Sequence, residues 1–517
     1  MDTTDLQFTA RLFSIFIFLF LTLVGLVFSI YLMSNASSMY TYAMAIIFLL
    51  LSIVSGFFNT ASAYWYYRSY YYDAYLKKLK SKLLPLRNYP TVAIAVPAYN
   101  ESPDLVTKNL TRLMQMDYPK DKMHFYLLDD STDQKICDKL KKFAASKKIT
   151  YMHRKQRTGY KAGALNNMLK QSKEEFLAIF DYDEYLTETS FLKELMPYFQ
   201  DKKLSYIQTT KKYADGTLFS DTVTLFDAFF FKFVQPSRAL NNTAVFAGSC
   251  GLIRRESIDA VGGFPEYIIE DTFFSFESDM NCYSSLYMPK VYALGKPIMT
   301  FSELAKQQWR YNYGDTQFLA YFLGRRPQEK VQKKLPTISK LDYLLHGLGF
   351  NYLSIVLILF TLTALLIAFS SISIAHISLS QIFAQRYLNF DLELFGVIAF
   401  IVSVMTPILL TKIYFGSVKK GFMLFLVNFA LAFIRAKAAF NAVFNLSPKA
   451  GWVRARLGQS GKLLNAIRSS STEIVFSIFL ILFGTIAIAI SNFSGGVWLL
   501  WYGILYSSTF FFFYKYG

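Results

Sequence analysis

Long apolar runs near both ends of the chain enclose a central region of different character. Leu12–Met33 and Tyr40–Ala63 are nearly free of charge, and each is long enough for a helix to cross a bilayer. Four later runs share this character, namely Leu348–Phe369, Leu394–Leu410, Glu473–Ser491 and Val497–Phe513. The pattern predicts six transmembrane helices, two before and four after the central region.

In the central region, short apolar runs alternate with polar, helix-like stretches. The apolar runs are typical of buried strands and cover residues 91–99, 124–130, 149–154, 175–183 and 205–210. Helical periodicity marks intervening segments such as Asp104–Met116 and Gln134–Ser146. This alternation predicts an α/β domain, with a mostly parallel sheet covered by helices on both faces. The expected units are residues 1–66, 67–334 and 335–517.

Charge settles how the ambiguous segment Gly421–Phe444 is interpreted. The segment is apolar enough to insert into a membrane, but Arg435 and Lys437 lie in its second half. If it lies on the membrane surface instead, every basic cluster faces one side, which the positive-inside rule assigns to the cytoplasm. We therefore expect interfacial helices here and at Leu335–Leu348, with the α/β domain and both termini in the cytoplasm at the plasma membrane.

The composition narrows the function classes. Most of the net charge of +18 follows from the positive-inside rule, although an anionic substrate or lipid surface is the other interpretation. The three cysteines are scattered and the four histidines lack metal-ligand spacing, which predicts neither a disulfide framework nor a zinc site. Transporters usually carry functional polar residues within their spans, so these nearly uncharged spans argue against a transporter or channel.

Candidate chemistry follows the predicted strands, where open α/β sheets bind their ligands. Tyr99-Asn100-Glu101, Asp129-Asp130 and Asp181-Tyr182-Asp183 each come directly after an apolar run. Two carboxylates at i and i+2 can share a hard divalent cation such as Mg²⁺ or Mn²⁺. A polar strand end without a metal is the other interpretation of this pair.

Two more polar clusters stand later in the chain, in YIIEDTFF (267–274) and KQQWRYNYGD (306–315). The apolar neighbours of Glu270 and Asp271 would raise the pKa of a carboxyl group and suit it to act as a general base, although helix N-termini also favour acidic residues. A site that binds a sugar acceptor needs aromatic faces that stack on sugar rings and amides that bond sugar hydroxyls. A guanidinium can hold a diphosphate. The second cluster supplies these groups in Gln307, Gln308, Trp309, Arg310 and Tyr311. An amphipathic helix at the membrane surface is the other interpretation.

Together and in this order, the motifs resemble those of the membrane-integrated, processive family 2 glycosyltransferases, the group of cellulose, hyaluronan and chitin synthases. That family carries D, D-x-D, T/E-E-D and Q-x-x-R-W. Its order is matched here by Asp129-Asp130, Asp181-Tyr182-Asp183, Ile269-Glu270-Asp271 and Gln307–Tyr311. Further similar segments are VPAYNE (96–101), GYKAGALN (159–166), YIQTT (206–210), FAGSCGLIRR (246–255) and FNLSPK (444–449). Tyr311 replaces the final Trp of the pattern, and Ile269 replaces its first Thr or Glu.

The resemblance implies a GT-A-type fold inserted between transmembrane segments and an inverting, metal-dependent sugar transfer. The donor would be a UDP-sugar, the cofactor Mg²⁺ or Mn²⁺, and the acceptor a growing β-linked polysaccharide that leaves through the protein's own channel. The alternative is single transfer to a lipid or polyprenyl-phosphate acceptor. Membrane lipids are expected partners and nucleic acid is not, whereas an accessory subunit or oligomer stays open.

The resemblance also implies residue roles. The donor site would comprise Tyr99, Glu101, Asp129, Asp130, Lys161, Asp181, Gln307 and Arg310. The metal would be held by Asp181 and Asp183. Catalysis would rest on Asp271 as the base, with Glu270 and Arg310. The acceptor and the channel entrance would contact Gly248, Ser249, Cys250, Gln308, Trp309 and Tyr311, and a gating loop would contain Phe444, Ser447 and Lys449.

Overall fold

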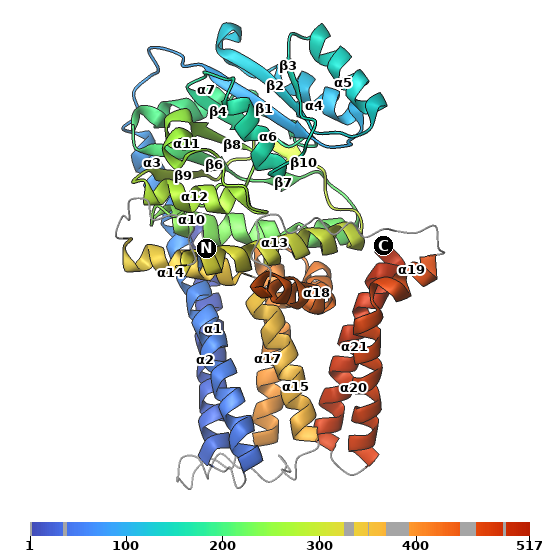
Figure 1. The fold of residues 1–517 in the computed structure, drawn as a ribbon. Coiled ribbons are helices and arrows are strands. Elements are labelled where there is room, and N and C mark those ends of the chain that lie inside the picture. The colour runs from blue at the N-terminus through green and yellow to red at the C-terminus, as the bar shows by residue number, and fades with distance from the viewer. Residues whose placement is uncertain are drawn as a thin grey trace.

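The structure is a computed structural model, and it describes residues 3–34, 39–324, 335–349, 351–368, 392–444, 462–489 and 493–517. An α/β domain stands above a set of long apolar helices (Figure 1). These helices run side by side as α1 (Thr3–Ser34), α2 (Met39–Tyr70), α15 (Asn351–Ala368), α17 (Leu392–Phe415), α20 (Ser471–Ala489) and α21 (Phe493–Tyr516).

Several described helices are long and apolar enough to cross a membrane. The five that qualify by length and composition contain Phe8–Tyr31, Ala45–Lys80, Val418–Phe444, Ser471–Ala489 and Gly496–Tyr516, and shorter apolar helical stretches lie at Ser354–Thr363 and Val404–Phe415. Helix α18 (Val418–Phe444) is one of the five, but it lies across the upper ends of α15 and α17, next to the α/β domain (Figure 1). This position fits an interfacial helix, while the number of spans and their sidedness stay predictions.

The large sheet has seven strands in the order β3-β2-β1-β4-β8-β6-β9. These strands are β1 (Val92–Ala98), β2 (Met123–Asp129), β3 (Thr150–His153), β4 (Phe176–Ile179), β6 (Leu204–Thr209), β8 (Gly251–Arg254) and β9 (Ser284–Met288). Only β8 is antiparallel to its neighbours, so the sheet is mostly parallel, as predicted. The five expected strands correspond to β1, β2, β3, β4 and β6. A small second sheet joins β5 (Tyr185–Leu186), β10 (Ala293–Gly295) and β7 (Lys212–Tyr213).

Both faces of the large sheet are buried, which explains why its strands read as continuous apolar runs. Alternate residues of β1 point to opposite faces, so Val92 and Ile94 join one core while Ala93 and Ala95 join the other. The first core includes α4 (Pro103–Leu113) and α5 (Gln134–Ser146), and the second α6 (Tyr160–Leu169), α11 (Arg255–Val261) and α12 (Glu270–Met280). The shorter elements are α3 (Tyr72–Lys80), η1 (Lys120–Lys122), α7 (Phe191–Leu195), η2 (Met196–Gln200), α8 (Leu218–Val223), α9 (Leu225–Phe229), η3 (Phe230–Val234), α10 (Gln235–Ala239) and α19 (Lys462–Ser469).

Two helices join the α/β domain to the bundle, α13 (Phe301–Phe322) and α14 (Thr337–Leu348). A capping box of Thr300 and Glu303 starts α13, which then packs along α18. Buried Asp342 of α14 accepts hydrogen bonds from Thr243 Oγ1 at 2.6 Å and Asn241 Nδ2 at 2.9 Å, so α14 is held to the α/β domain. The helix expected at Leu335–Leu348 is therefore present as α14.

Gly314 of α13 allows this helix to approach the segment before α12. A Cβ atom at this position would lie 2.6 Å from Cγ2 and 2.8 Å from Cγ1 of buried Ile269, which directly precedes Glu270. Gly314→Ala should therefore destabilise the protein by about 1–3 kcal/mol through overpacking. Thermal unfolding in detergent measures the effect, with the exposed-site variant Lys306→Ala as the control. An equal melting temperature for the two variants would show that α13 and the segment before α12 can move apart without loss of stability.

Candidate active site

Polar side chains gather where β1, β2 and β4 end. Asn100, which follows β1 with a φ of 54°, ties this edge together. Its backbone N donates to Ser131 Oγ at 2.8 Å, and its Oδ1 accepts from the backbone N of Thr132 at 2.8 Å. The loops after β1 and β2 therefore form one fixed surface beside Tyr99 and Glu101, in the region where ligands of open α/β sheets bind.

The two aspartates after β2 are fixed in different ways. Asp129 is fully buried, with Oδ1 accepting from the backbone N of Ser131 at 2.9 Å and Oδ2 from the Tyr151 hydroxyl at 2.7 Å. Asp130 pairs with Arg154, whose Nε donates to Oδ1 at 2.8 Å. Arg157 places its guanidinium carbon 3.5 Å from the ring centroid of Tyr99 and brings its Nε within 3.9 Å of Asp130. The predicted nucleotide residues Tyr99, Asp129 and Asp130 thus share one wall.

The centre of the site is an ion cluster around Asp181, which follows β4. Lys161 Nζ lies 2.5 Å from Asp181 Oδ1, and Lys211 Nζ lies 3.7 Å from Oδ2. The hydroxyl of Ser249 is within hydrogen-bond distance of two carboxylate oxygens, Asp181 Oδ2 at 2.8 Å and Glu184 Oε1 at 2.7 Å. Glu184 also accepts from the backbone N of Asp181 at 2.9 Å and pairs with Lys211 at 3.4 Å. Carboxylates and cations therefore balance each other in a compact network.

The charges of this cluster move two pKa values in opposite directions. Burial alone would raise the pKa of Asp181, but Lys161 and Lys211, with hydrogen bonds from Lys161 and Ser249, lower it below its ordinary value. Burial and the charges of Asp181 and Glu184 raise the pKa of Asp183 to about 7. Repulsion of this kind favours a cation beside Asp183, and the hard oxygen donors of Asp181 and Asp183 fit Mg²⁺ or Mn²⁺.

Three members of this network were missed by sequence reasoning. Buried Glu184 directly follows the D-x-D segment, and Lys211 directly follows YIQTT. Gln208 is fully buried and holds the loop before β8, because its Oε1 accepts from the backbone N of Ala247 at 2.7 Å and its Nε2 donates to Ser249 O at 3.0 Å. The available signals were the positions of Glu184 and Lys211 next to recognised motifs and of Gln208 within YIQTT.

The loop before β8 meets the start of α12. Gly248 has a φ of 83°, and a Cβ atom there would lie 3.0 Å from Asp271 Oδ2 and 3.8 Å from Lys161 Nζ. Ser275 Oγ accepts from the backbone N of Phe246 and donates to Asp271 O, at 2.8 and 2.7 Å. The candidate base and the Asp181 cluster therefore face the same small space, which only a glycine at position 248 leaves open.

The acidic pair at the start of α12, Glu270 and Asp271, is half-buried. Burial and the charge of Asp271 raise the pKa of Glu270 to about 7. Burial also raises the pKa of Asp271, against the hydrogen bond from the backbone N of Thr272 and the charges of Lys161 and Lys211. The two neighbouring carboxyl groups therefore titrate as a coupled pair, and a raised pKa suits Asp271 to act as a general base.

The Q-x-x-R-Y segment lies on α13, so its side chains divide between two faces. Gln307, Arg310 and Tyr311 are half-buried at helical spacing on one face. Burial raises the pKa of Tyr311 to about 12, and charges on Asp227, Arg310, Lys211 and Asp271 act on it, which places this phenol beside the site.

Two residues expected to contact the acceptor are used differently. Buried Gln308 accepts from Nε and Nη2 of buried Arg435 in α18, at 3.0 and 2.8 Å. Trp309 stacks on Tyr313 with ring centroids 4.9 Å apart, beside Ala438 and Ala442 of α18. Both side chains therefore connect α13 to α18, because a helix turns successive residues to different faces.

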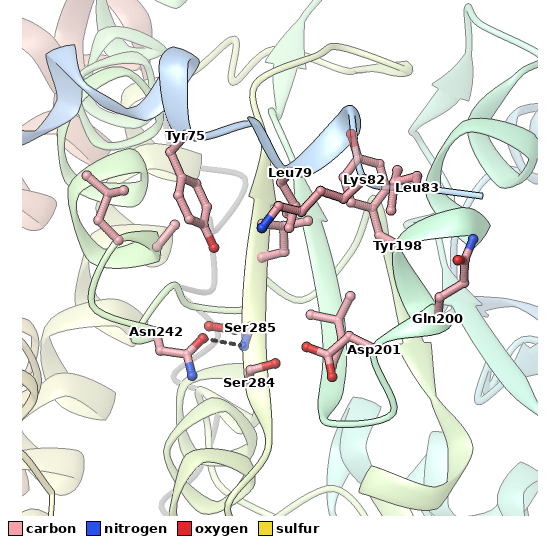
Figure 2. A pocket seen from close by; sticks show the side chains of 14 residues that line it. Tyr75, Leu79, Lys82, Leu83, Tyr198, Gln200, Asp201, Asn242, Ser284 and Ser285 are labelled. Carbon is pink, nitrogen blue, oxygen red and sulfur yellow. Dashed lines mark hydrogen bonds between the residues drawn. The ribbon is translucent and has the colours of Figure 1, made fainter. Parts of the chain in front are cut away.

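The remaining predicted residues are distributed as follows. Cys250 is buried with a φ of 51°, so its place is in the core beneath Ser249. Phe444 ends α18 and is exposed, whereas Ser447 and Lys449 lie outside the described residues. A separate cavity of ≈ 620 Å³ opens at the β9 edge of the sheet, where Tyr75, Asn242 and Ser285 line it (Figure 2). None of the predicted site residues lines that cavity.

Known proteins are similar to this chain over its α/β domain. Residues 93–262 match the family model described as Glycosyl transferase family 2. The chain is 31% identical over 237 residues to a cellulose synthase catalytic subunit (UDP-forming) of Pseudomonas fluorescens (strain SBW25), covering 44% of this chain and 31% of that protein. The corresponding protein of Xanthomonas axonopodis pv. citri (strain 306) is 29% identical over 293 residues, covering 54% of this chain and 39% of that protein.

The fold itself is similar to that of a mannosyltransferase from Pyrobaculum calidifontis, PcManGT, solved in complex with GDP-Man and Mn²⁺. The TM-score is 0.50 at 17% identity, with 77% of this chain and 99% of that chain covered. The α/β domain thus has the GT-A-like fold that the sequence predicts. Residues 93–262 match the model of glycosyl transferase family 2, and the chain is similar to bacterial cellulose synthase catalytic subunits and carries helices long and apolar enough to cross a membrane.

Proposed function

We propose that this protein is an inverting membrane glycosyltransferase that extends a β-linked polysaccharide from a UDP-sugar donor and moves the product through its own helices. The chain spans about a third of the curated relatives it matches, 31% of the Pseudomonas fluorescens protein and 39% of the Xanthomonas axonopodis protein. The relatives described as UDP-forming support the donor class. The mannosyltransferase solved in complex with GDP-Man and Mn²⁺ supports a divalent cation.

One geometric observation carries the proposal. A Cβ atom at Gly248 would lie 3.0 Å from Asp271 Oδ2 and 3.8 Å from Lys161 Nζ, and Lys161 is paired with Asp181 at 2.5 Å. A family 2 reaction needs a donor-binding carboxylate and an acceptor-side base on the two sides of a single carbon atom. The shared space at Gly248 supports that arrangement. The half-buried face of α13 with Arg310 lies beside it, next to the helices proposed to form the exit path.

The roles assigned to these residues follow from their chemistry. Tyr99, Asp129 and Asp130 would hold the nucleoside, and Asp181 with Lys161 would orient the sugar and diphosphate. Asp183, with Asp181, would hold Mg²⁺ or Mn²⁺, which when bound offsets the negative charge of the diphosphate. Arg310 would stabilise the additional charge that develops on departing UDP.

The transfer is a single displacement. An acceptor hydroxyl attacks the anomeric carbon, its proton passes to Asp271, and the bond from that carbon to the diphosphate oxygen breaks. The bonding electron pair leaves with UDP, so the anomeric configuration inverts. Glu270 directly precedes Asp271, and the charge coupling between these two half-buried carboxyl groups would tune this step.

The decisive experiment identifies the product. Purified protein in nanodiscs would be given a panel of radiolabelled UDP-sugars with Mg²⁺ or Mn²⁺, and UDP release and product size would be measured. We expect a high-molecular-weight polymer from one donor. A single-sugar product that extracts into organic solvent would instead support transfer to a lipid or polyprenyl-phosphate acceptor and would rule out the polymer proposal.

Asp271→Asn should separate binding from catalysis. Loss of a positioned general base lowers turnover by about 10²–10⁴-fold, whereas the UDP contacts assigned to other residues remain. Turnover and the Kd for UDP are measured on the same preparation. Asp259→Asn is the matched control, since Asp259 is exposed and pairs with Arg255 on α11. Equal loss of UDP binding and turnover in Asp271→Asn would contradict the role of base.

Turnover should also depend on pH through the acidic pair. Glu270 gains a proton as pH falls below its pKa of about 7, and Asp271 gains one as pH falls through its own raised pKa, after which it cannot accept the acceptor proton. The rate of the chemical step should therefore fall on the acidic side of neutrality. Glu270→Gln removes a neighbouring negative charge, lowers the pKa of Asp271 and should move this acidic limb to lower pH. If the acidic limb of the pH–rate profile stays at the same pH in Glu270→Gln, the titrating group is not this acidic pair.

A further inference from the structure

Three potential metal ligands meet at the β3 edge of the large sheet. Asp129 ends β2 and His153 ends β3, and these two residues are direct partners in the parallel register. Cys137 lies in the first turns of α5, which follows β2. A carboxylate oxygen, the thiol sulfur and an imidazole nitrogen of these residues all lie within 4.8 Å of one another.

These donors differ in kind from those of the Asp181–Asp183 pair. A thiolate, an imidazole and a carboxylate are the ligands that Zn²⁺ prefers, at bond lengths of about 2.0–2.3 Å in a tetrahedral arrangement. Ligand atoms that already lie within 4.8 Å of one another need only small side-chain rotations to reach such bonds. Mg²⁺ and Mn²⁺ favour sites built from oxygen ligands, so the two sites should select different metals.

The surroundings orient the candidate ligands. Tyr151 donates to Asp129 Oδ2 at 2.7 Å and the backbone N of Ser131 to Oδ1 at 2.9 Å, which fixes the carboxylate in the way that outer-shell hydrogen bonds orient metal ligands. The Cys137 thiol lies 3.4 Å from Ser131 O. Asp129 and Cys137 are buried while His153 is exposed, so an ion enters from the His153 side and water can fill the fourth position.

We propose that Asp129, Cys137 and His153 form a Zn²⁺ site and that Zn²⁺ bound there excludes the nucleotide donor. Binding converts the Cys137 thiol to a thiolate and releases its proton to solvent. The exclusion rests on the proposed function, because Asp129 is also assigned to the nucleoside. Separations of 8 residues from Asp129 to Cys137 and 16 from Cys137 to His153 gave no zinc signature in the sequence, and only the fold brings the three residues together.

Zinc binding is measured by equilibrium dialysis of the full chain in detergent, without nucleotide. Cys137→Ser and His153→Gln should each lose zinc that the parent protein retains. Cys282→Ser and His124→Gln are matched controls outside the cluster and should bind as the parent does. Because His153 is exposed, its substitution leaves folding intact. Equal zinc binding by all five proteins would overturn the site.

Competition tests the second half of the proposal. Zn²⁺ should weaken UDP binding by the parent protein at least tenfold, and this effect should disappear in His153→Gln. Cobalt substitution gives an independent reading, since the thiolate-to-metal absorption band should be lost in Cys137→Ser. UDP binding that is unaffected by bound Zn²⁺ would overturn the exclusion. Because zinc binding is measured without sugar transfer, failure of the proposed activity would not alter it.

Discussion

The structure depends on neutralising carboxylates that the fold brings close together in partly buried surroundings. Asp181 and Glu184 follow β4, and the nearby Lys161 and Lys211, with the hydroxyl of Ser249, offset their charges there. These five side chains come from four separate segments of the chain. The ion cluster therefore fixes the loop before β8 and the start of α6 relative to the central strand, and the candidate base is placed by the same contacts.

A second constraint joins this cluster to the membrane part. Arg435 of α18 is fully buried, and its guanidinium is held by the neutral amides of Gln308 and Asn428. Leaving such a buried polar group without its partner costs about 1–3 kcal/mol, and more for a charge. The contact holds α13 against α18, so the face that carries Arg310 and Tyr311 stays in register with the ion cluster. An active site on a loop would lack this rigidity.

The wall that holds Asp129 and the space at Gly248 lie along one edge of the sheet but differ in construction. The space at Gly248 is formed by a backbone that approaches Asp271 closely, whereas the wall is formed by side chains from the ends of β2 and β3 and the start of α5. The Asp181 region offers hard carboxylate oxygens as metal ligands, whereas the wall around Asp129 also offers the softer thiol of Cys137 and imidazole of His153. One sheet edge can therefore present different metal preferences a short distance apart, because each strand end contributes its own residues.

The sequence by itself determined the elements and their class. Continuous apolar runs predicted β1 to β4 and β6, and motif order predicted the family, because both patterns are local or linear. Tertiary structure decided what linear order cannot express. In the folded chain, Gln308 and Trp309 contact α18 rather than the site. Lys211 and Gln208 lie in the site, and β8 joins the large sheet as its antiparallel strand. Helical rotation and strand register set these outcomes, since both depend on which surfaces meet after the chain has folded.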